Sequence, residues 1–80
     1  MKTYLLIWFN SDGASPSEVN RRLMSMGFLP MQGPYDYVYN WDNNVDVDEI
    51  LRFGDKVHLT LQDMGVLFKT ETIENTTLGL

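Results

Sequence analysis

The chain has 80 residues, no cysteine and a net charge of −5 at pH 7. This length fits one domain, the lack of cysteine excludes disulfides and thiol chemistry, and the acidic charge argues against unaided binding of nucleic acid. The apolar run from Tyr4 to Phe9 has only six residues, too short for a signal-peptide core or a membrane span. We therefore expect a cytoplasmic protein without a membrane partner.

The first predicted elements are a strand and a helix. Residues 3–10, TYLLIWFN, are apolar on both alternating faces, which is typical of a strand at the centre of a sheet. The motif SPSE at 15–18 then predicts a helix start, because the serine hydroxyl can accept from the glutamate amide and proline fits the first turn. Apolar residues follow at helical spacing and Gly27 supplies a stop, so we place this helix at roughly 16–26.

A short strand and a tyrosine-rich strand come next. Residues 28–31 predict an edge strand, because Pro30 cannot donate a hydrogen bond to a sheet ladder. A Gly-Pro turn at 33–34 leads into residues 35–41, YDYVYNW, which alternate aromatic side chains on one face with aspartate, valine and asparagine on the other. This period of two predicts a strand.

A second helix and a final strand complete the expected elements. Asp46 and the acids after it predict a helix start, and the apolar stripe of this helix comprises Ile50, Phe53, Val57, Leu61 and Met64. Gly54 lies on the same side, where it costs about 1 kcal/mol relative to alanine, so we expect the first helix to approach closely there. Gly65 ends the helix, residues 66–73 form a β-branched strand, and residues 74–80 predict a flexible C-terminal tail.

The order strand, helix, strand, strand, helix, strand predicts an α+β fold. Right-handed crossovers give an antiparallel four-stranded sheet with two helices on one face, the ferredoxin-like βαββαβ two-layer sandwich. We assign residues 1–73 to this single domain.

The second half of the chain reads GPYDYV, then a capped helix that ends in TLQDMGV, then FKTETI. This pattern resembles the RAM effector-binding domain of the Lrp/AsnC regulators. In that family a Gly-x-x-Asp turn opens the third strand and a Thr-Glu-Thr run lies in the last. The matches here are Gly33, Asp36, Gly65 and residues 70–72. The interval from Gly27 to Gly33 is shorter than in that family, and we expect a stand-alone version of the domain, without a helix-turn-helix before it. The resemblance implies dimers through the sheets and a small effector, such as an amino acid, between subunits. The ligand-binding residues it implies are Gly33, Tyr35, Asp36, Thr70 and Thr72.

The aromatic residues have more than one interpretation. The sheet face opposite the helices carries one alternation of each strand, and Tyr4, Leu6 and Trp8 can share it with the tyrosines of residues 35–39. In one hypothesis these tyrosines are core residues with hydroxyls at the rim. In the other they form the sheet interface of a homo-oligomer. A third, base stacking on an RNA-recognition sheet, is disfavoured by the acidic charge.

An acidic loop offers an alternative function. Residues 42–49 concentrate oxygen ligands, and Ca²⁺ takes six to eight oxygens in proteins. The glycine that an EF-hand loop needs at its sixth position is missing, because Val47 stands there. A solvated loop that caps the second helix is the simpler interpretation. The candidate ligands for Ca²⁺ or another cation are Asp42, Asn44, Asp46, Asp48 and Glu49.

The single histidine defines a third function class. His58 has Asp55 three residues before it, a spacing common for surface pairs on helices, and no other catalytic set is visible. We therefore expect a non-enzymatic domain that self-associates through its sheet face and binds a small molecule as a regulatory or assembly module. A cation-binding protein using residues 42–49 is the alternative, and a small enzyme with His58 as base is the third hypothesis.

Overall fold

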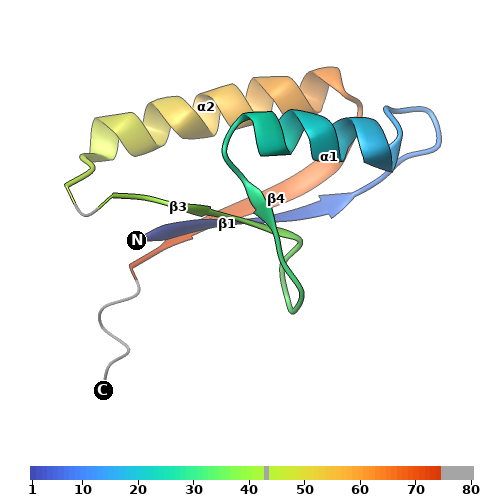
Figure 1. The fold of residues 1–80 in the computed structure, drawn as a ribbon. Coiled ribbons are helices and arrows are strands. Elements are labelled where there is room, and N and C mark those ends of the chain that lie inside the picture. The colour runs from blue at the N-terminus through green and yellow to red at the C-terminus, as the bar shows by residue number, and fades with distance from the viewer. Residues whose placement is uncertain (43, 75–80) are drawn as a thin grey trace.

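The predicted ferredoxin-like α+β sandwich is confirmed. The computed structural model describes residues 1–42 and 44–74. Its elements are β1 (Lys2–Trp8), α1 (Pro16–Ser25), β2 (Leu29–Pro30), β3 (Tyr37–Asn40), α2 (Val47–Asp63) and β4 (Leu67–Ile73). The strands form one antiparallel sheet in the order β2-β3-β1-β4, and both helices cover one side of it (Figure 1). Apart from Glu74, the predicted tail lies outside the described residues.

Both helices begin with the caps that the sequence predicts. The Ser15 hydroxyl accepts a hydrogen bond from the Glu18 amide, and the Glu18 carboxylate accepts one from the Ser15 amide, each at 3.3 Å. The Asp46 carboxylate accepts from the Glu49 amide at 2.9 Å, which starts α2. Gly27 follows α1 with φ +103°, a backbone conformation that favours glycine. Local capping chemistry therefore sets the bounds of both helices.

The strands occupy the predicted places with shorter bounds. As expected, β1 lies in the interior of the sheet and the Pro30-containing β2 lies at its edge. The tyrosine strand begins at Tyr37 rather than residue 35. Before it, the Ile7 amide of β1 donates its hydrogen bond to the Asp36 carboxylate, at 2.9 Å, instead of to a backbone carbonyl of the tyrosine strand. The last strand begins at Leu67, because the Val66 amide bonds to the end of α2.

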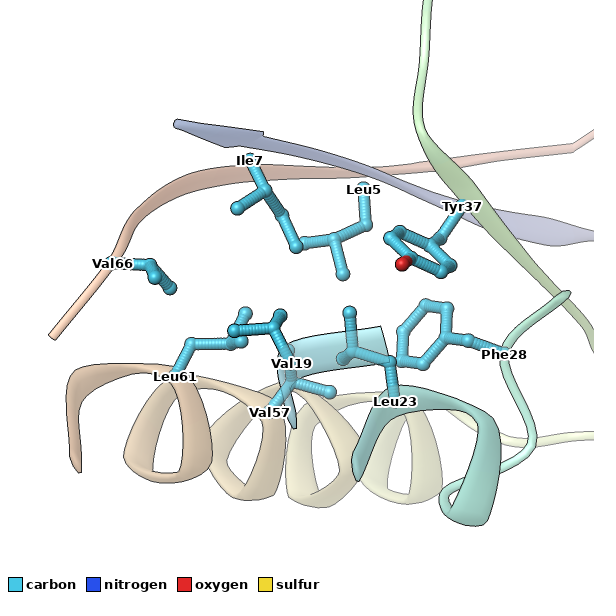
Figure 2. Close-up of a cluster of buried hydrophobic side chains, with 9 residues drawn as sticks. All are labelled: Leu5, Ile7, Val19, Leu23, Phe28, Tyr37, Val57, Leu61 and Val66. Atoms are coloured by element: carbon cyan, nitrogen blue, oxygen red, sulfur yellow. The ribbon is translucent and has the colours of Figure 1, made fainter. Parts of the chain in front are cut away.

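The core fills the space between the sheet and the two helices (Figure 2). Its nine buried residues are Leu5, Ile7, Val19, Leu23, Phe28, Tyr37, Val57, Leu61 and Val66. The predicted stripe of α2 contributes Val57 and Leu61, while Phe53 packs at the margin with its ring centroid 4.4 Å from that of Tyr39. None of the helices in the described ranges is long and apolar enough to cross a membrane.

The expected close approach of α1 to Gly54 is wrong. A Cβ placed on Gly54 meets nothing within 4 Å, because this residue lines a shallow cavity above β4. The close approach occurs instead at Gly13, where a Cβ would lie 2.4 Å from the Gly65 carbonyl oxygen. The Ala14 amide donates to the Met64 carbonyl at 2.8 Å beside it. The end of α2 is thereby tied to the loop before α1.

Candidate functional site

The sheet side without helices forms an uncovered apolar surface, which we call the open face. Because Leu5 and Ile7 of β1 are buried toward the helices, the alternate residues of β1 and their cross-strand partners point the other way. Four of the large side chains there are substantially exposed, namely Trp8 (51%), Leu29 (52%), Leu67 (71%) and Ile73 (37%). The remaining members are Lys2, Tyr4, Leu6, Val38, Asn40, Lys69 and Glu71.

An aromatic stack lies against the open face. The ring of Tyr35, from the turn before β3, stacks on Tyr4 with centroids 4.9 Å apart and an interplanar angle of 28°. The Tyr35 hydroxyl donates a hydrogen bond to the Glu71 carboxylate on β4. The turn is thus joined across β1 to the far edge strand, and a ring and a carboxylate lie side by side.

Of the two hypotheses for the tyrosines of residues 35–39, the core fits Tyr37, which is buried, and Tyr39, which packs partly buried against the core; neither belongs to the open face. Their partners in the register, Leu5 and Thr3, face the helices. Tyr37 is 7% exposed, and its hydroxyl donates to the Asn20 side-chain oxygen at 2.7 Å. Burial raises the pKa of the Tyr37 phenol, and the charge of Asp36 raises it further.

The structure gathers only part of the ligand set implied by the RAM resemblance. Gly33, at φ +123°, Tyr35 and Asp36 share the turn before β3. Asp36 is engaged with the β1 backbone, because its carboxylate accepts from the Ile7 amide and its own amide donates to Leu5. Thr70 and Thr72 lie on the helix side of β4, opposite Leu5 and Thr3 in the register.

The Thr72 hydroxyl already has a structural partner. It lies 2.8 Å from the hydroxyl of buried Thr3, which also accepts from the Trp41 indole nitrogen at 2.7 Å. Glu71, between the two threonines, projects from the opposite face and meets Tyr35. Sequence reasoning did not include Glu71 in the site. The signal for it was the alternation of the Thr-Glu-Thr run itself, which sends its middle residue to the other side.

The acidic loop does not bring its five oxygen-bearing residues together. Asp42, Asn44 and Glu49 line an open cavity of about 610 Å³ beside Tyr39 and Trp41. Asp46 serves as the cap of α2, and Asp48 is exposed in its first turn. Across residues 1–42 and 44–74, no group of three or more histidine, cysteine or acidic side chains is placed to hold a metal ion.

His58 packs as an aromatic residue on the outer flank of α2. Its ring makes an edge contact with Phe68 of β4, with centroids 5.6 Å apart. It lines the cavity of about 450 Å³ above β4 together with Gly54, Asp55 and Thr70. This position makes His58 part of a shallow groove between α2 and the edge strand.

Comparison with known proteins found no match, whether against family models, curated proteins or solved structures. The RAM resemblance stays a prediction from the sequence. Function is therefore inferred from the open face and the residues around it.

Proposed function

We propose that this protein is a non-enzymatic assembly module that associates with a second copy of itself through the open face. The observation that carries the proposal is the exposure of Trp8, Leu29, Leu67 and Ile73 on one side of a single sheet. Trp8 and Leu67 are partners in the register, and large apolar side chains that gather on an exposed face commonly mark an interface between subunits.

The distribution of charge favours a second copy of the chain as the partner that covers the open face. The chain carries a net charge of −5, yet the charged residues of the open face are two lysines, Lys2 and Lys69, and one acid, Glu71. The helices on the other side carry five acids against four bases, a net charge of −1, and five further acids lie in the loops and just after β4. Two acidic copies therefore repel each other least when their open faces meet.

A small molecule between the subunits is the second part of the proposal. The turn that carries Gly33 and Asp36 brings the Tyr35 ring and the Glu71 carboxylate to the open face. A carboxylate beside a ring suits the ammonium group of an amino acid, through a charge-assisted hydrogen bond and ring contact. The RAM resemblance supports an amino acid as the ligand class. Thr70 and Thr72 have no part in this site, because they face the helices.

The solution mass tests the assembly. Light scattering across a concentration series is expected to show self-association of the wild-type chain, and Trp8→Asp is expected to halve the mass at equal concentration. Leu59→Asp is the matched control, because Leu59 is 65% exposed on α2 rather than on the sheet. A wild-type mass that stays monomeric at millimolar concentration, or a Trp8→Asp mass equal to wild type, would overturn the proposal.

Amino acid binding has its own readout. Titration of the assembled protein with each amino acid, followed by backbone amide shifts, is expected to move the signals of residues 33–36 and of Glu71. The Glu71→Gln variant removes the charge while it retains an acceptor for Tyr35, so it is expected to weaken binding of the amino acid. No shift with any amino acid would dispose of the ligand and leave the assembly standing.

A further inference from the structure

The outer edge of β4 carries backbone groups that no other strand of the described residues uses. β4 (Leu67–Ile73) ends the strand order β2-β3-β1-β4, and within residues 1–42 and 44–74 no hydrogen bond reaches its outer side. The strand is seven residues long and contains neither proline nor glycine. An unprotected edge of this length is a template for another strand.

The register shows which residues of β4 point outward. In β1, the Leu5 carbonyl and the Ile7 amide both bond to Asp36 on the β3 side, so the even-numbered residues of β1 direct their backbone groups toward β4. Antiparallel pairing matches Tyr4 with Glu71 and Leu6 with Lys69. The odd-numbered residues of β4 therefore bond to β1. Its even-numbered residues, Phe68, Thr70 and Thr72, present their amides and carbonyls to the outside.

The sequence of β4 is complementary to itself about Thr70. In an antiparallel pair of two copies centred there, Lys69 lies opposite Glu71 of the partner subunit, and Leu67 lies opposite Ile73 of the partner subunit. Opposite charges and apolar pairs at facing positions stabilise a sheet, whereas like charges destabilise it. A two-fold axis at Lys69 would place Lys69 opposite Lys69 of the second copy, and an axis at Glu71 would place Glu71 opposite Glu71. Either arrangement brings like charges together. Thr70 is the centre at which both charge pairs and the apolar pair form together.

We propose that β4 pairs antiparallel with β4 of a second copy about Thr70, and so joins two sheets into one continuous eight-stranded sheet. The outward groups of Phe68 then bond to those of the partner's Thr72, and Thr70 bonds to its own symmetry mate. On the helix side, the partner's Phe68 lies next to Thr72, where the cavity of about 450 Å³ beside Gly54 leaves room.

This edge contact is a different surface from the open face. Edge pairing places two open faces side by side in one sheet, so the two contacts together give a tetramer and either alone gives a dimer. The edge proposal does not depend on the proposed function. In the Trp8→Asp background the face contact is disabled, and the remaining association reports on the edge.

Thr70→Pro tests the edge at its centre. Proline lacks the outward amide that the pair needs, and it costs no bond to β1, because the Thr70 amide does not point there. Thr70→Val keeps the amide and is the control. In the Trp8→Asp background, Thr70→Pro is expected to halve the mass and Thr70→Val to leave it unchanged. Circular dichroism confirms that both variants are folded. A Thr70→Pro mass equal to that of the control would overturn the proposal.

Charge exchange tests the register. Lys69→Glu and Glu71→Lys each create like-charge pairs and are expected to stay monomeric in the Trp8→Asp background. Mixing the two restores both charge pairs and is expected to give a mixed dimer by native mass spectrometry. The double variant is expected to pair with itself, although it also lacks the Tyr35 contact. Failure of the mixture to pair would rule out the Thr70 centre.

Amide exchange separates the edge from every other mode of contact. As concentration rises, the amides of Phe68, Thr70 and Thr72 are expected to exchange more slowly, while the neighbouring odd-numbered amides, already bonded to β1, keep their rates. Association that leaves all three amides unprotected would contradict edge pairing and leave the open face as the sole contact. Protection that appears only on adding an extended peptide would assign the edge to a foreign strand and overturn the proposal.

Discussion

Tyr35 and Glu71 are 36 residues apart in the chain and are joined by a hydrogen bond from the tyrosine hydroxyl to the carboxylate. The contact holds the turn before β3 against the far edge strand, over the ring of Tyr4. It also fixes both groups that we propose for recognition of a small molecule. The same two side chains therefore hold the turn in place and form the proposed binding site.

Tyr35→Phe is expected to reduce the free energy of unfolding by less than about 1 kcal/mol. The hydrogen bond is exposed, and typical net contributions are about 0.5–1.5 kcal/mol. The ring stack on Tyr4 remains. Urea unfolding measures the change, and a double-mutant cycle with Glu71→Gln isolates the coupling between the two side chains. A coupling energy of zero would show that the contact does not hold in solution.

Gly54→Ala is expected to stabilise the protein by about 1 kcal/mol, because alanine has the higher helix propensity and nothing lies within 4 Å of the new methyl group. Gly13→Ala is the matched control, for which the opposite change in stability is expected. Its Cβ would lie 2.4 Å from the Gly65 carbonyl oxygen, so the loop or the end of α2 must shift and stability must fall. Urea midpoints compare the two variants. A destabilised Gly54→Ala would mean that the cavity above β4 is occupied in solution.

The helices could be predicted from the sequence because their signals are local. A serine and a glutamate three residues apart specify the start of α1 whatever surrounds them, and the stripe of α2 depends only on helical spacing. Gly54 marks the limit of such reasoning. The cost of glycine in a helix can be read from the sequence, whereas tertiary packing decides which side chains surround Gly54. A Cβ placed on Gly54 meets no described atom within 4 Å.

The site was harder to predict because it depends on where strand pairing begins. The sequence alternates tyrosines from residue 35, but the Asp36 carboxylate replaces a ladder bond to Ile7 and β3 starts only at Tyr37. Tyr35 is therefore outside the alternation and crosses to the open face, while Tyr37 enters the core. The departure of Tyr35 from the alternation follows from one side-chain hydrogen bond, and composition and periodicity carry no sign of it.

Asp36→Ala is expected to cost about 1–3 kcal/mol, because it removes the acceptor of the Ile7 amide beside the buried Ile7 side chain. Asp36→Asn keeps a side-chain oxygen and is expected to recover most of the loss. Urea unfolding gives the energies, and hydrogen exchange at the Ile7 amide gives the local effect. Equal stability of Asp36→Ala and wild type would show that water replaces the carboxylate at this amide.

Tyr37→Phe is expected to cost about 1 kcal/mol at neutral pH, because the Asn20 side-chain oxygen loses its donor. The cost is expected to shrink at high pH. Burial raises the pKa of Tyr37 in the folded state, so above about pH 10 the phenol ionises first in the unfolded chain. The wild type therefore has its full stability below that pH and loses part of it as the pH rises toward the folded-state pKa. The Tyr37→Phe variant has no phenol to ionise, so it does not lose stability in this way.

Urea unfolding of wild type and Tyr37→Phe at about pH 7 and about pH 11 measures the difference in their free energies of unfolding at each pH. Other titrating groups are the same in both proteins, so their contribution cancels in this difference. A difference that is constant with pH would mean that Tyr37 ionises as readily in the core as in water.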